Sequence, residues 1–339
     1  RILGEDLVIF KTTENKIGLV HKNCPHRRAS LAYGKCEKKG IRCCYHGWLF
    51  SPDGEILETP GEDPKSKSAK KLRETFKLGA YPVIEFNGLI FAYMGPEPAP
   101  LLPRWDLYIR PHGFRQIVAT MLPCNWLQVM ENRADTAHAI YLHGRLHQYA
   151  LERLGKVTDD PVARYNQIMV LQEERLKKGI YVKHRPVYNQ FGFTKGTLAS
   201  DQNEDELSWQ MGVNPVLFPY QLIYGLGWGT MRQNYQFGVP IDDTTTWQFH
   251  YFCYTPPAGV DIPEQKSVPY VQVPLETGDG RYILDNTQSQ DMVAWPGQGE
   301  ISDRTQEHLG SIDVTIMAYR KLLKEQIQVV QDGGEPINI

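Results

Sequence analysis

Two short segments near the N-terminus, residues 24–26 (CPH) and 43–46 (CCYH), constrain this chain more than any other feature. Each pairs a cysteine with a nearby histidine, so two such loops together offer two thiolates and two imidazoles to a metal centre. Two chemistries use this set: tetrahedral zinc, and a 2Fe–2S cluster with cysteines on one iron and histidines on the other. A disulfide scaffold is excluded, because 6 cysteines in 339 residues are too few. The candidate ligands are Cys24, His26, Cys43 and His46.

The residues around these ligands favour the iron–sulfur cluster over zinc. The segments 24–31 (CPHRRASL) and 43–48 (CCYHGW) closely resemble the two cluster-binding boxes of Rieske proteins. By this resemblance Cys43 is the ligand of the second box, and Cys44 is expected to be a small packed side chain. Rieske proteins of respiratory complexes carry an extra cysteine in each box, joined as a disulfide. Ala29 and Tyr45 stand at those positions here, which favours the oxygenase branch.

A second motif, D-x-x-H-x-x-x-x-H, follows at Asp135, His138 and His143. Apolar residues at helical spacing predict a helix from Asn125 to about Leu142. On an ideal α-helix the two histidines point about 140° apart. The helix must therefore loosen or end between them before both can reach one metal ion. Asp135 lies between the two directions, which suits a carboxylate that orients a ligating imidazole.

The two motifs in this order resemble the catalytic α subunit of Rieske non-haem iron oxygenases, and the resemblance covers nearly the whole chain. That family holds a mononuclear iron with two histidines and a distant carboxylate, leaving positions open for oxygen. Here the resemblance implies that His138 and His143 are the two histidine ligands of that iron. The segment 288–313 resembles the C-terminal signature of the phthalate dioxygenase-like branch, in which Asp291, after Gln290, takes the ligand position. The alternative carboxylates are Asp285, Glu300 and Asp303.

A proline-rich stretch divides the chain. Residues 95–103 (GPEPAPLLP) can continue neither a helix nor a strand ladder, so we expect a domain boundary there. The resemblance implies an α+β protein: an all-β Rieske domain over 1–102 and a helix-grip catalytic domain over 103–339, with an antiparallel sheet and a C-terminal helix. Sequence patterns predict strands over 6–11, 17–20, 81–86, 89–93, 115–121 and 246–254, a long loop over 255–280, and helices over 286–295 and after Ser311.

Charge and hydropathy exclude other classes. The net charge of −2 gives no general attraction to nucleic acid, and no run of apolar residues is long enough to span a membrane. We expect a cytoplasmic protein. A local basic run over residues 65–73 is read as a solvated loop, or alternatively as a docking patch for an acidic redox partner. Arg1 falls in a stretch read as a strand, so we expect residues to precede it.

The resemblance implies the terminal oxygenase of a multicomponent system. Electrons would come from NADH through a separate reductase with flavin and a ferredoxin-type cluster, because this chain has no Gly-rich dinucleotide loop. O2 would be activated at Fe(II) to hydroxylate or dihydroxylate a small aromatic substrate, an aromatic carboxylate or aryl ether, in aromatic hydrocarbon catabolism. The alternative is an O- or N-demethylating monooxygenase. A Rieske electron carrier, which needs only the first hundred residues, and a zinc-binding interaction module are the rivals.

The resemblance also implies assembly. Subunits of the family form a C3 homotrimer in which a carboxylate links a cluster histidine of one subunit to an iron histidine of the next. Asp135 would then join His46 to His138. Arg185 or Arg232 could pair with a substrate carboxylate. The remaining histidines are expected to be packed or surface residues: His21, His112, His147, His184, His250 and His308. For His250, which falls in a predicted strand, the alternative is that it faces the pocket.

Overall fold

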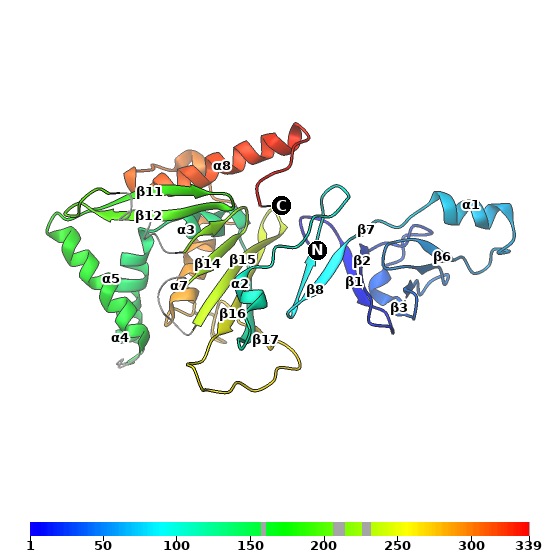
Figure 1. The fold of residues 1–339 in the computed structure, drawn as a ribbon, viewed down its shortest axis with the longest axis horizontal. Coiled ribbons are helices and arrows are strands. Elements are labelled where there is room, and N and C mark those ends of the chain that lie inside the picture. The colour runs from blue at the N-terminus through cyan, green and yellow to red at the C-terminus, as the bar shows by residue number, and fades with distance from the viewer. Residues whose placement is uncertain (157–160, 206–213, 226–231, 339) are drawn as a thin grey trace. The chain divides into compact units, whose positions relative to one another are not determined.

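The computed structural model describes residues 1–156, 161–205, 214–225 and 232–338 (Figure 1). The chain forms two compact units, Arg1–Arg104 and Trp105–Ile339, which are described separately below. Both strands and helices are present, so the expected α+β class is confirmed. None of the helices in the described ranges is long and apolar enough to cross a membrane.

The N-terminal unit is built from short strands. They form a three-stranded sheet in the order β1-β2-β7, a four-stranded sheet in the order β3-β4-β5-β6, and the hairpin β8-β9. The expected hairpin turn is present, because Asn87 and Gly88 both have the positive φ angles of a two-residue turn. The bounds are β1 Leu7–Lys11, β2 Ile17–His21, η1 Leu31–Tyr33, β3 Lys35–Cys36, β4 Ile41–Arg42, β5 Leu49–Phe50, β6 Ile56–Glu58, β7 Ala80–Tyr81, β8 Val83–Phe86 and β9 Leu89–Ala92.

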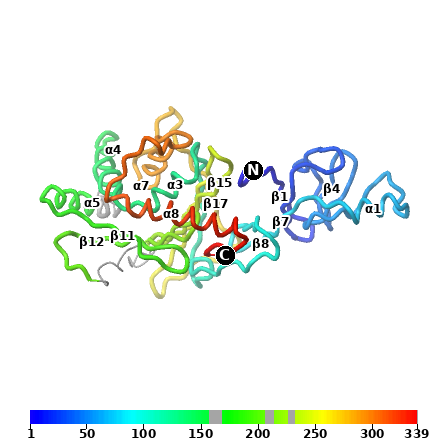
Figure 2. The backbone as a smooth tube through the Cα atoms, turned by 90° about the horizontal axis from the view of Figure 1, so that it is seen from above, coloured from blue at the N-terminus to red at the C-terminus, as the bar shows by residue number. Residues whose placement is uncertain are grey.

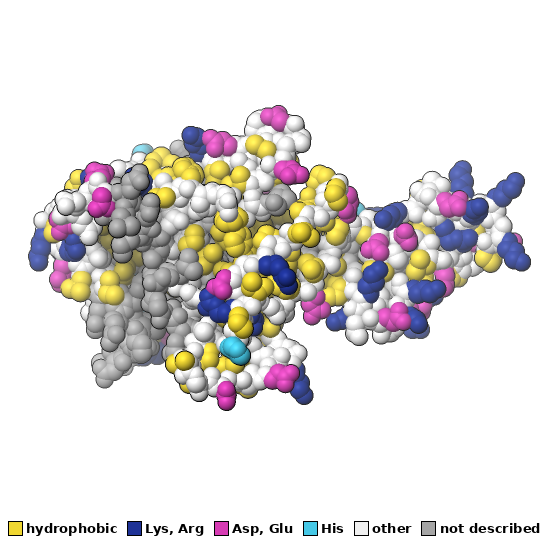
Figure 3. Space-filling model, in the orientation of Figure 1, with side chains coloured by type: hydrophobic (Ala, Val, Ile, Leu, Met, Phe, Trp, Pro, Cys, Tyr) yellow, Lys and Arg dark blue, Asp and Glu magenta, His cyan; other side chains and the backbone are white. Residues whose placement is uncertain are grey.

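Two details of this unit differ from expectation. Arg1 precedes β1 and is not part of a strand. The basic run forms helix α1 (Lys67–Thr75) rather than a loop, because the Ser66 side chain accepts a hydrogen bond from the backbone N–H of Ala69 and caps its first turn. The unit is therefore not purely β. Basic side chains gather around α1 in Figure 3.

The second unit contains an eight-stranded sheet in the order β11-β12-β13-β14-β15-β16-β10-β17. All neighbours are antiparallel except β17, which pairs with β10 in parallel. β17 lies within residues 255–280, which the prolines predicted to be a loop. It is a short edge strand of three residues that pairs with β10, and such a strand can form between prolines. The bounds are β10 Phe114–Leu122, β11 Val182–Asn189, β12 Gly192–Ala199, β13 Val216–Leu217, β14 Gln221–Tyr224, β15 Arg232–Asp242, β16 Thr245–Tyr254 and β17 Tyr270–Gln272.

Helices α3, α7 and α8 belong to the same unit as this sheet (Figures 1 and 2). α3 lies close to β15 at Gly238, where an added Cβ would be 3.4 Å from Val129 Cγ1 and from Arg133 Nη1. Apolar residues of α3, α8 and three strands share one buried cluster. The helical bounds are α2 Asp106–Ile109, α3 Trp126–Ala134, η2 Ala139–Leu146, α4 His147–Arg153, α5 Pro161–Lys177, α7 Thr287–Ala294, η3 Pro296–Gln298, η4 Arg304–Gln306, η5 Ser311–Asp313 and α8 Val314–Gln331.

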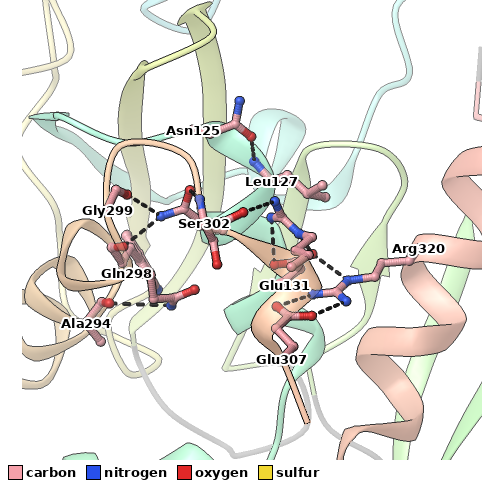
Figure 4. Close-up of polar contacts among 12 residues, drawn as sticks. Asn125, Leu127, Glu131, Ala294, Gln298, Gly299, Ser302, Glu307 and Arg320 are labelled. Carbon is pink, nitrogen blue, oxygen red and sulfur yellow. Dashed lines mark hydrogen bonds and ion pairs between the residues drawn. The ribbon is translucent and has the colours of Figure 1, made fainter. Parts of the chain in front are cut away.

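A buried carboxylate on α3 links this helix to Arg304 of η4 and Arg320 of α8 (Figure 4). Glu131 on α3 is 5% exposed and accepts two hydrogen bonds of 2.9 Å from Arg304 and one of 2.6 Å from Arg320 on α8. Arg320 also binds Glu307. A buried charge is tolerated when it is paired and hydrogen-bonded in this way. The network fixes α3, the helix that leads into the His138 motif.

Candidate functional site

The two Cys–His boxes fold into loops closed by the same pair of backbone hydrogen bonds. In the first, the Cys24 N–H donates to the Ala29 carbonyl, and the Arg28 N–H donates to the Cys24 carbonyl, both at 2.9 Å. In the second, the Cys43 N–H donates to the Trp48 carbonyl at 2.8 Å, and the N–H of the fifth loop residue donates back to Cys43 at 3.1 Å. Each loop needs a positive φ at its fifth residue, supplied by Arg28 and by Gly47.

These loops place like ligands together. Cys24 and Cys43 are 1% and 3% exposed. Burial is the main cause that raises the pKa of the Cys24 thiol to about 11; backbone N–H groups of His26 and Arg27 act against it, and the neighbouring Cys43 adds to it. The His26 and His46 rings lie 4.6 Å apart between centroids. Cys44 is exposed, so the expectation that it packs inside is wrong: it follows Cys43 directly and the turn directs it outward.

The expected long helix does not form. α3 ends at Ala134, because the Asp135 carboxylate accepts the backbone N–H groups of Ala137 at 2.7 Å and His138 at 3.2 Å and starts a new turn. The chain then enters η2, which is a π-helix. A π-helix bonds residue i to residue i+5. The five-residue spacing of His138 and His143, awkward on an α-helix, is therefore close to one turn here.

His138, His143 and Asp291 meet as a result. One ligand atom from each lies within 4.8 Å of the others, the only such group of three or more among the residues that the structure describes. The Asp291 Oδ1 atom is 3.2 Å from His143 Nε2 and 3.5 Å from His138 Nε2. Asp291 comes from α7, whose N-cap is Asn286.

The alternative carboxylates are engaged elsewhere or lie outside this group. Asp285 forms an ion pair with Lys156 at 2.5 Å. Asp303 accepts the Thr305 backbone N–H and caps η4. Glu300 is not among the three side chains that meet. Of the four candidate carboxylates, Asp291 is therefore the one that meets the two histidines.

The carboxylate of Asp291 and the imidazole of His143 shift each other's pKa values toward their charged forms. Burial alone would raise the pKa of Asp291, but the hydrogen bond and charge of His143 and the charge of His138 hold it below its usual value. Burial alone would lower the pKa of His143, yet its interaction with Asp291 raises it. An anionic oxygen between two imidazoles is an arrangement that a cation can occupy in place of protons.

The other ring nitrogens are held by acceptors. Asp135 Oδ2 lies 2.9 Å from His138 Nδ1, as the motif predicted for an orienting carboxylate. Gln290 Oε1 lies 3.0 Å from His143 Nδ1, and its amide nitrogen lies 2.8 Å from His147 Nδ1. With Nδ1–H groups donating to these oxygens, Nε2 is the nitrogen that each ring would offer to a metal.

Sequence reasoning missed several of these contacts. In the sequence Gln290 stands out only as the neighbour of Asp291, and His147 has the pattern of an ordinary packed or surface histidine. The signal that could have found His147 is its position four residues after His143, with a buried polar residue beside the third ligand. Lys195, which is 7% exposed, was also missed: it donates to the carbonyls of Arg133 at 2.7 Å and Asp135 at 3.3 Å and so caps the end of α3.

Both donor sets fit the metals that such sites hold. Two imidazoles and one carboxylate with open positions are the set that non-haem Fe(II) oxygenases use. Two buried thiols and two imidazoles, each pair close together, match a 2Fe–2S centre with unlike irons. The His26 ring also stacks on Trp48 with 4.7 Å between centroids, which fixes the direction of its nitrogens.

Comparison with known proteins agrees with this chemistry. Residues 1–82 match the Rieske 2Fe-2S domain family, and residues 275–339 match the family described as LigXa C-terminal domain like. The chain is 35% identical to the 5,5'-dehydrodivanillate O-demethylase oxygenase subunit of Sphingobium sp. (strain NBRC 103272 / SYK-6), over 99% of this chain and 72% of that protein. It is 28% identical to the phthalate 4,5-dioxygenase oxygenase subunit of Pseudomonas putida, over 99% and 78% respectively.

Solved structures share the fold. NdmA of Pseudomonas putida CBB5 superposes with a TM-score of 0.62 and 16% identity, over 98% of this chain and 84% of that one. Dicamba monooxygenase gives 0.57 and 14%, over 97% and 92%. A zinc module and a separate Rieske electron carrier do not account for these matches. The chain therefore belongs to the Rieske non-haem iron oxygenases, oxidoreductases with a Rieske cluster and a mononuclear iron, as a catalytic α subunit resembling the phthalate dioxygenase branch.

Proposed function

We propose that this protein is the terminal oxygenase of a Rieske system that O-demethylates a methoxy-aromatic substrate. The observation that carries the assignment as an oxygenase is the convergence of ligand atoms from His138, His143 and Asp291 within 4.8 Å of one another. We assign these three as ligands of Fe(II), which when bound supplies the activation of O2 beside the substrate. Ring hydroxylation and demethylation both require this set of ligands.

We also assign the four cluster ligands. Cys24 and Cys43 would bind one iron, and His26 and His46 the other. We assign the described unit Arg1–Arg104 to the cluster and the unit Trp105–Ile339 to the mononuclear iron. Buried thiols with a raised pKa, such as Cys24, must lose their protons when a metal binds.

The neighbouring residues hold the ligands in one orientation. Asp135 and Gln290 accept the Nδ1–H groups of His138 and His143, so each ring presents Nε2. Asn132 Nδ2 lies 3.5 Å from Asp291 Oδ1 and limits its rotation. A set of ligands fixed before substrate arrives costs no reorganisation during the reaction.

The relative that spans nearly the whole chain at 35% identity is named as an O-demethylase, which favours this reaction here. The atoms and electrons of O-demethylation balance as in a monooxygenation. The methyl C–H of Ar–O–CH3 is hydroxylated by one atom of O2, while the other leaves as water with two electrons and two protons. The resulting hemiacetal breaks into a phenol and formaldehyde.

Ring dihydroxylation is the second candidate. The relatives that also span the chain include proteins named as phthalate and phenoxybenzoate dioxygenases, at 28% and 29% identity. It would give a cis-dihydrodiol and no formaldehyde. A substrate carboxylate or aryl ether would suit either reaction.

Electrons from NADH would arrive through a separate reductase carrying flavin and a ferredoxin-type cluster, and the cytoplasm, where NADH is available, is the proposed location. A carbazole 1,9a-dioxygenase oxygenase, whose structure is solved in complex with ferredoxin, shares this fold with a TM-score of 0.62. We further propose the C3 homotrimer of the family. In it, Asp135 of one subunit would join its own His138 to His46 of a neighbour.

The test is turnover. The holoenzyme is supplied with NADH, O2 and a generic reductase, and a panel of methoxy-aromatics and aromatic carboxylates is scored for formaldehyde and for diols. Formaldehyde equal to the substrate consumed supports demethylation, and a dihydrodiol selects ring attack. Absence of both products with every compound, while the centres are fully loaded, would contradict the proposed function.

A further inference from the structure

One face of the sheet in the second unit carries buried polar atoms that have no hydrogen-bond partner in the described part of the chain. The face is the one that α3 covers at Gly238. On it, Thr120, Asn234 and His250 are 1%, 1% and 3% exposed. Thr120 Oγ1, both amide atoms of Asn234, and His250 Nδ1 find no hydrogen-bond partner among the described residues. Native proteins leave few such atoms unpaired, because each costs about 1–3 kcal/mol.

The strand register shows that these residues lie next to one another. Val118 on β10 pairs with His250 on β16, so Thr120, two residues along, shares the face of His250. On the other side, Asn234 on β15 pairs with Phe252, which is two residues from His250. Thr120, His250 and Asn234 therefore form a diagonal across three adjacent strands, in which consecutive members are diagonal neighbours, typically about 7–8 Å apart.

Neighbouring side chains fix the proton on His250. Arg133 Nη2 donates to Gln248 Oε1, so the Gln248 amide must turn its NH2 group the other way. That NH2 lies 3.0 Å from His250 Nε2, which is therefore the acceptor. The remaining nitrogen, Nδ1, then carries the hydrogen. His250 presents an unpaired N–H donor to this face.

His250 stays neutral in this position. Burial, followed by the charge of Arg133, lowers the pKa of His250 to about 3, while the charge of Asp291 acts in the opposite direction. Contacts through α3 connect His250 to the assigned iron ligands. Gln248, which contacts His250 Nε2, is held by Arg133 of α3, and the preceding residue of that helix, Asn132, has its Nδ2 atom 3.5 Å from Asp291 Oδ1. The unpaired atoms thus lie on the sheet face near the assigned iron ligands.

Asn234 sets the more selective requirement. Its side chain offers one acceptor, Oδ1, and one donor group, Nδ2, and both are unpaired. A carboxylate or an ether oxygen can accept hydrogen bonds but has no hydrogen to give to Asn234 Oδ1. A hydroxyl group can do both: its oxygen accepts from His250 Nδ1–H while its hydrogen is donated to Asn234.

We propose that Asn234 and His250 bind a hydroxyl group on the aromatic ring of the substrate. This inference rests on the proposed function and deepens it, because it names the substrate as a hydroxylated aromatic, with a phenol such as an ortho-methoxyphenol as the simplest form. The second donor of Asn234 can then contact an adjacent ether oxygen. Selectivity follows from the unpaired polar atoms that a substrate without the hydroxyl would leave behind.

Matched probes test this inference by binding. Isothermal titration of the oxidised holoenzyme compares 2-methoxyphenol with 1,2-dimethoxybenzene, in which O–CH3 replaces O–H, and with 2-methoxybenzoate. We expect 2-methoxyphenol to bind at least about tenfold more tightly than either analogue, from the cost of the unsatisfied groups. Asn234→Leu and His250→Phe should each reduce this preference to about twofold or less. Gln272→Ala, which removes an exposed amide from β17, should keep it.

The outcomes separate the two proposals. Equal binding of 2-methoxyphenol and 1,2-dimethoxybenzene to the unmodified holoenzyme overturns the inference, as does tighter binding of 2-methoxybenzoate. It is also overturned if either variant folds, keeps its visible absorption and retains the full preference. Failure to release formaldehyde or a diol while the binding preference holds contradicts the proposed reaction and leaves the hydroxyl site standing.

Discussion

The contacts of single side chains account for how the assigned iron ligands are held. His143 depends on Gln290, which is fully buried and spans the space between His143, His147 and the Leu284 carbonyl. An amide in this position fixes which nitrogen of His143 carries the hydrogen. A residue that acts through a ligand affects metal affinity without touching the metal.

Replacing Gln290 by leucine should therefore weaken the iron site. Gln290→Leu leaves His143 Nδ1–H without an acceptor, and we expect iron affinity to fall by about 10–100-fold. Iron retained against a competing chelator measures this, while the visible absorption of the cluster should stay unchanged. Gln298→Leu is the control, since that glutamine is exposed. Equal iron retention in both variants would show that Gln290 does not position His143.

His250 should make the protein sensitive to acid. Its pKa is about 3 when folded and 6.5 in the reference state, so the unfolded chain binds a proton that the folded chain does not. Stability is therefore lost as the pH falls below 6.5. Between pH 7 and pH 5 this single group accounts for about 2 kcal/mol, or about 4–8 °C in the melting temperature of a unit of this size.

The comparison of wild type with His250→Gln isolates this effect, because every other titrating group is common to both proteins. Thermal unfolding is followed at pH 7 and pH 5. The wild type should lose about 4–8 °C more than the variant over this range. Identical losses would mean that His250 is already protonated or is accessible to water in the folded state.

Residue types that carry chemistry could be read from the sequence, whereas their partners could not. Cys24 and His26 are recognisable because few other patterns place a thiol and an imidazole so close together. The role of Gln290 depends on a residue 147 positions earlier in the chain, with which it shares no local pattern. The unpaired atoms of Asn234 become visible only when the register of the sheet is known.

At the level of elements, the segment between α3 and α4 decides whether a metal site can form. Apolar periodicity predicts one helix from Asn125 to about Leu142. The directions of His138 and His143 add the condition that this helix must loosen or end between them if both are to reach one metal ion. Helical periodicity continues through the segment, which is why the break after Ala134 was not placed. Asp135 supplies that break by accepting two backbone N–H groups, and the π-helical turn follows. Periodicity reports which residues are apolar, not which backbone bond pattern they adopt.

α3 itself depends on Glu131. Glu131→Gln removes the carboxylate that pairs with Arg304 and Arg320, so Arg304 loses this ion pair while Arg320 keeps the one with Glu307. Breaking a fully buried pair costs about 3–5 kcal/mol, and these arginines keep some contact with water, so we expect a loss of about 2 kcal/mol. The melting temperature should fall by about 4–8 °C.

An exposed ion pair on α8 provides the comparison. Lys321 and Glu325 on α8 lie 3.7 Å apart with both side chains largely in solvent. Glu325→Gln should change the melting temperature by less than about 2 °C, since exposed pairs contribute little. If the two substitutions have equal effects, Glu131 is not the residue that holds α3 against α8.

On the scale of the whole molecule, the proposed trimer makes electron transfer depend on Asp135. Asp135→Asn should keep both metal centres, because its amide can still accept a hydrogen bond from His138. The substituted side chain lacks the charge that would bridge two imidazole N–H groups. We expect the reduced cluster to be reoxidised far more slowly when substrate and oxygen are added. Rapid-mixing absorbance of the pre-reduced protein measures this rate.

Two results would refute that account. Reoxidation of the Asp135→Asn cluster at the wild-type rate would mean that the carboxylate is not on the electron path. A native mass of one subunit in the active enzyme would exclude a path between subunits. Assembly could be anticipated only from the family resemblance, because no residue pattern within one chain identifies a symmetric interface.

The central claim is that His138, His143 and Asp291 hold the iron at which oxygen is used. Iron content and visible absorption of Asp291→Ala, measured beside turnover and beside Asp285→Ala as the matched control, test it most directly. We predict that Asp291→Ala keeps its cluster absorption, loses the mononuclear iron and loses turnover, while Asp285→Ala retains all three. Full iron content and activity in Asp291→Ala would contradict the account and give the role to another carboxylate.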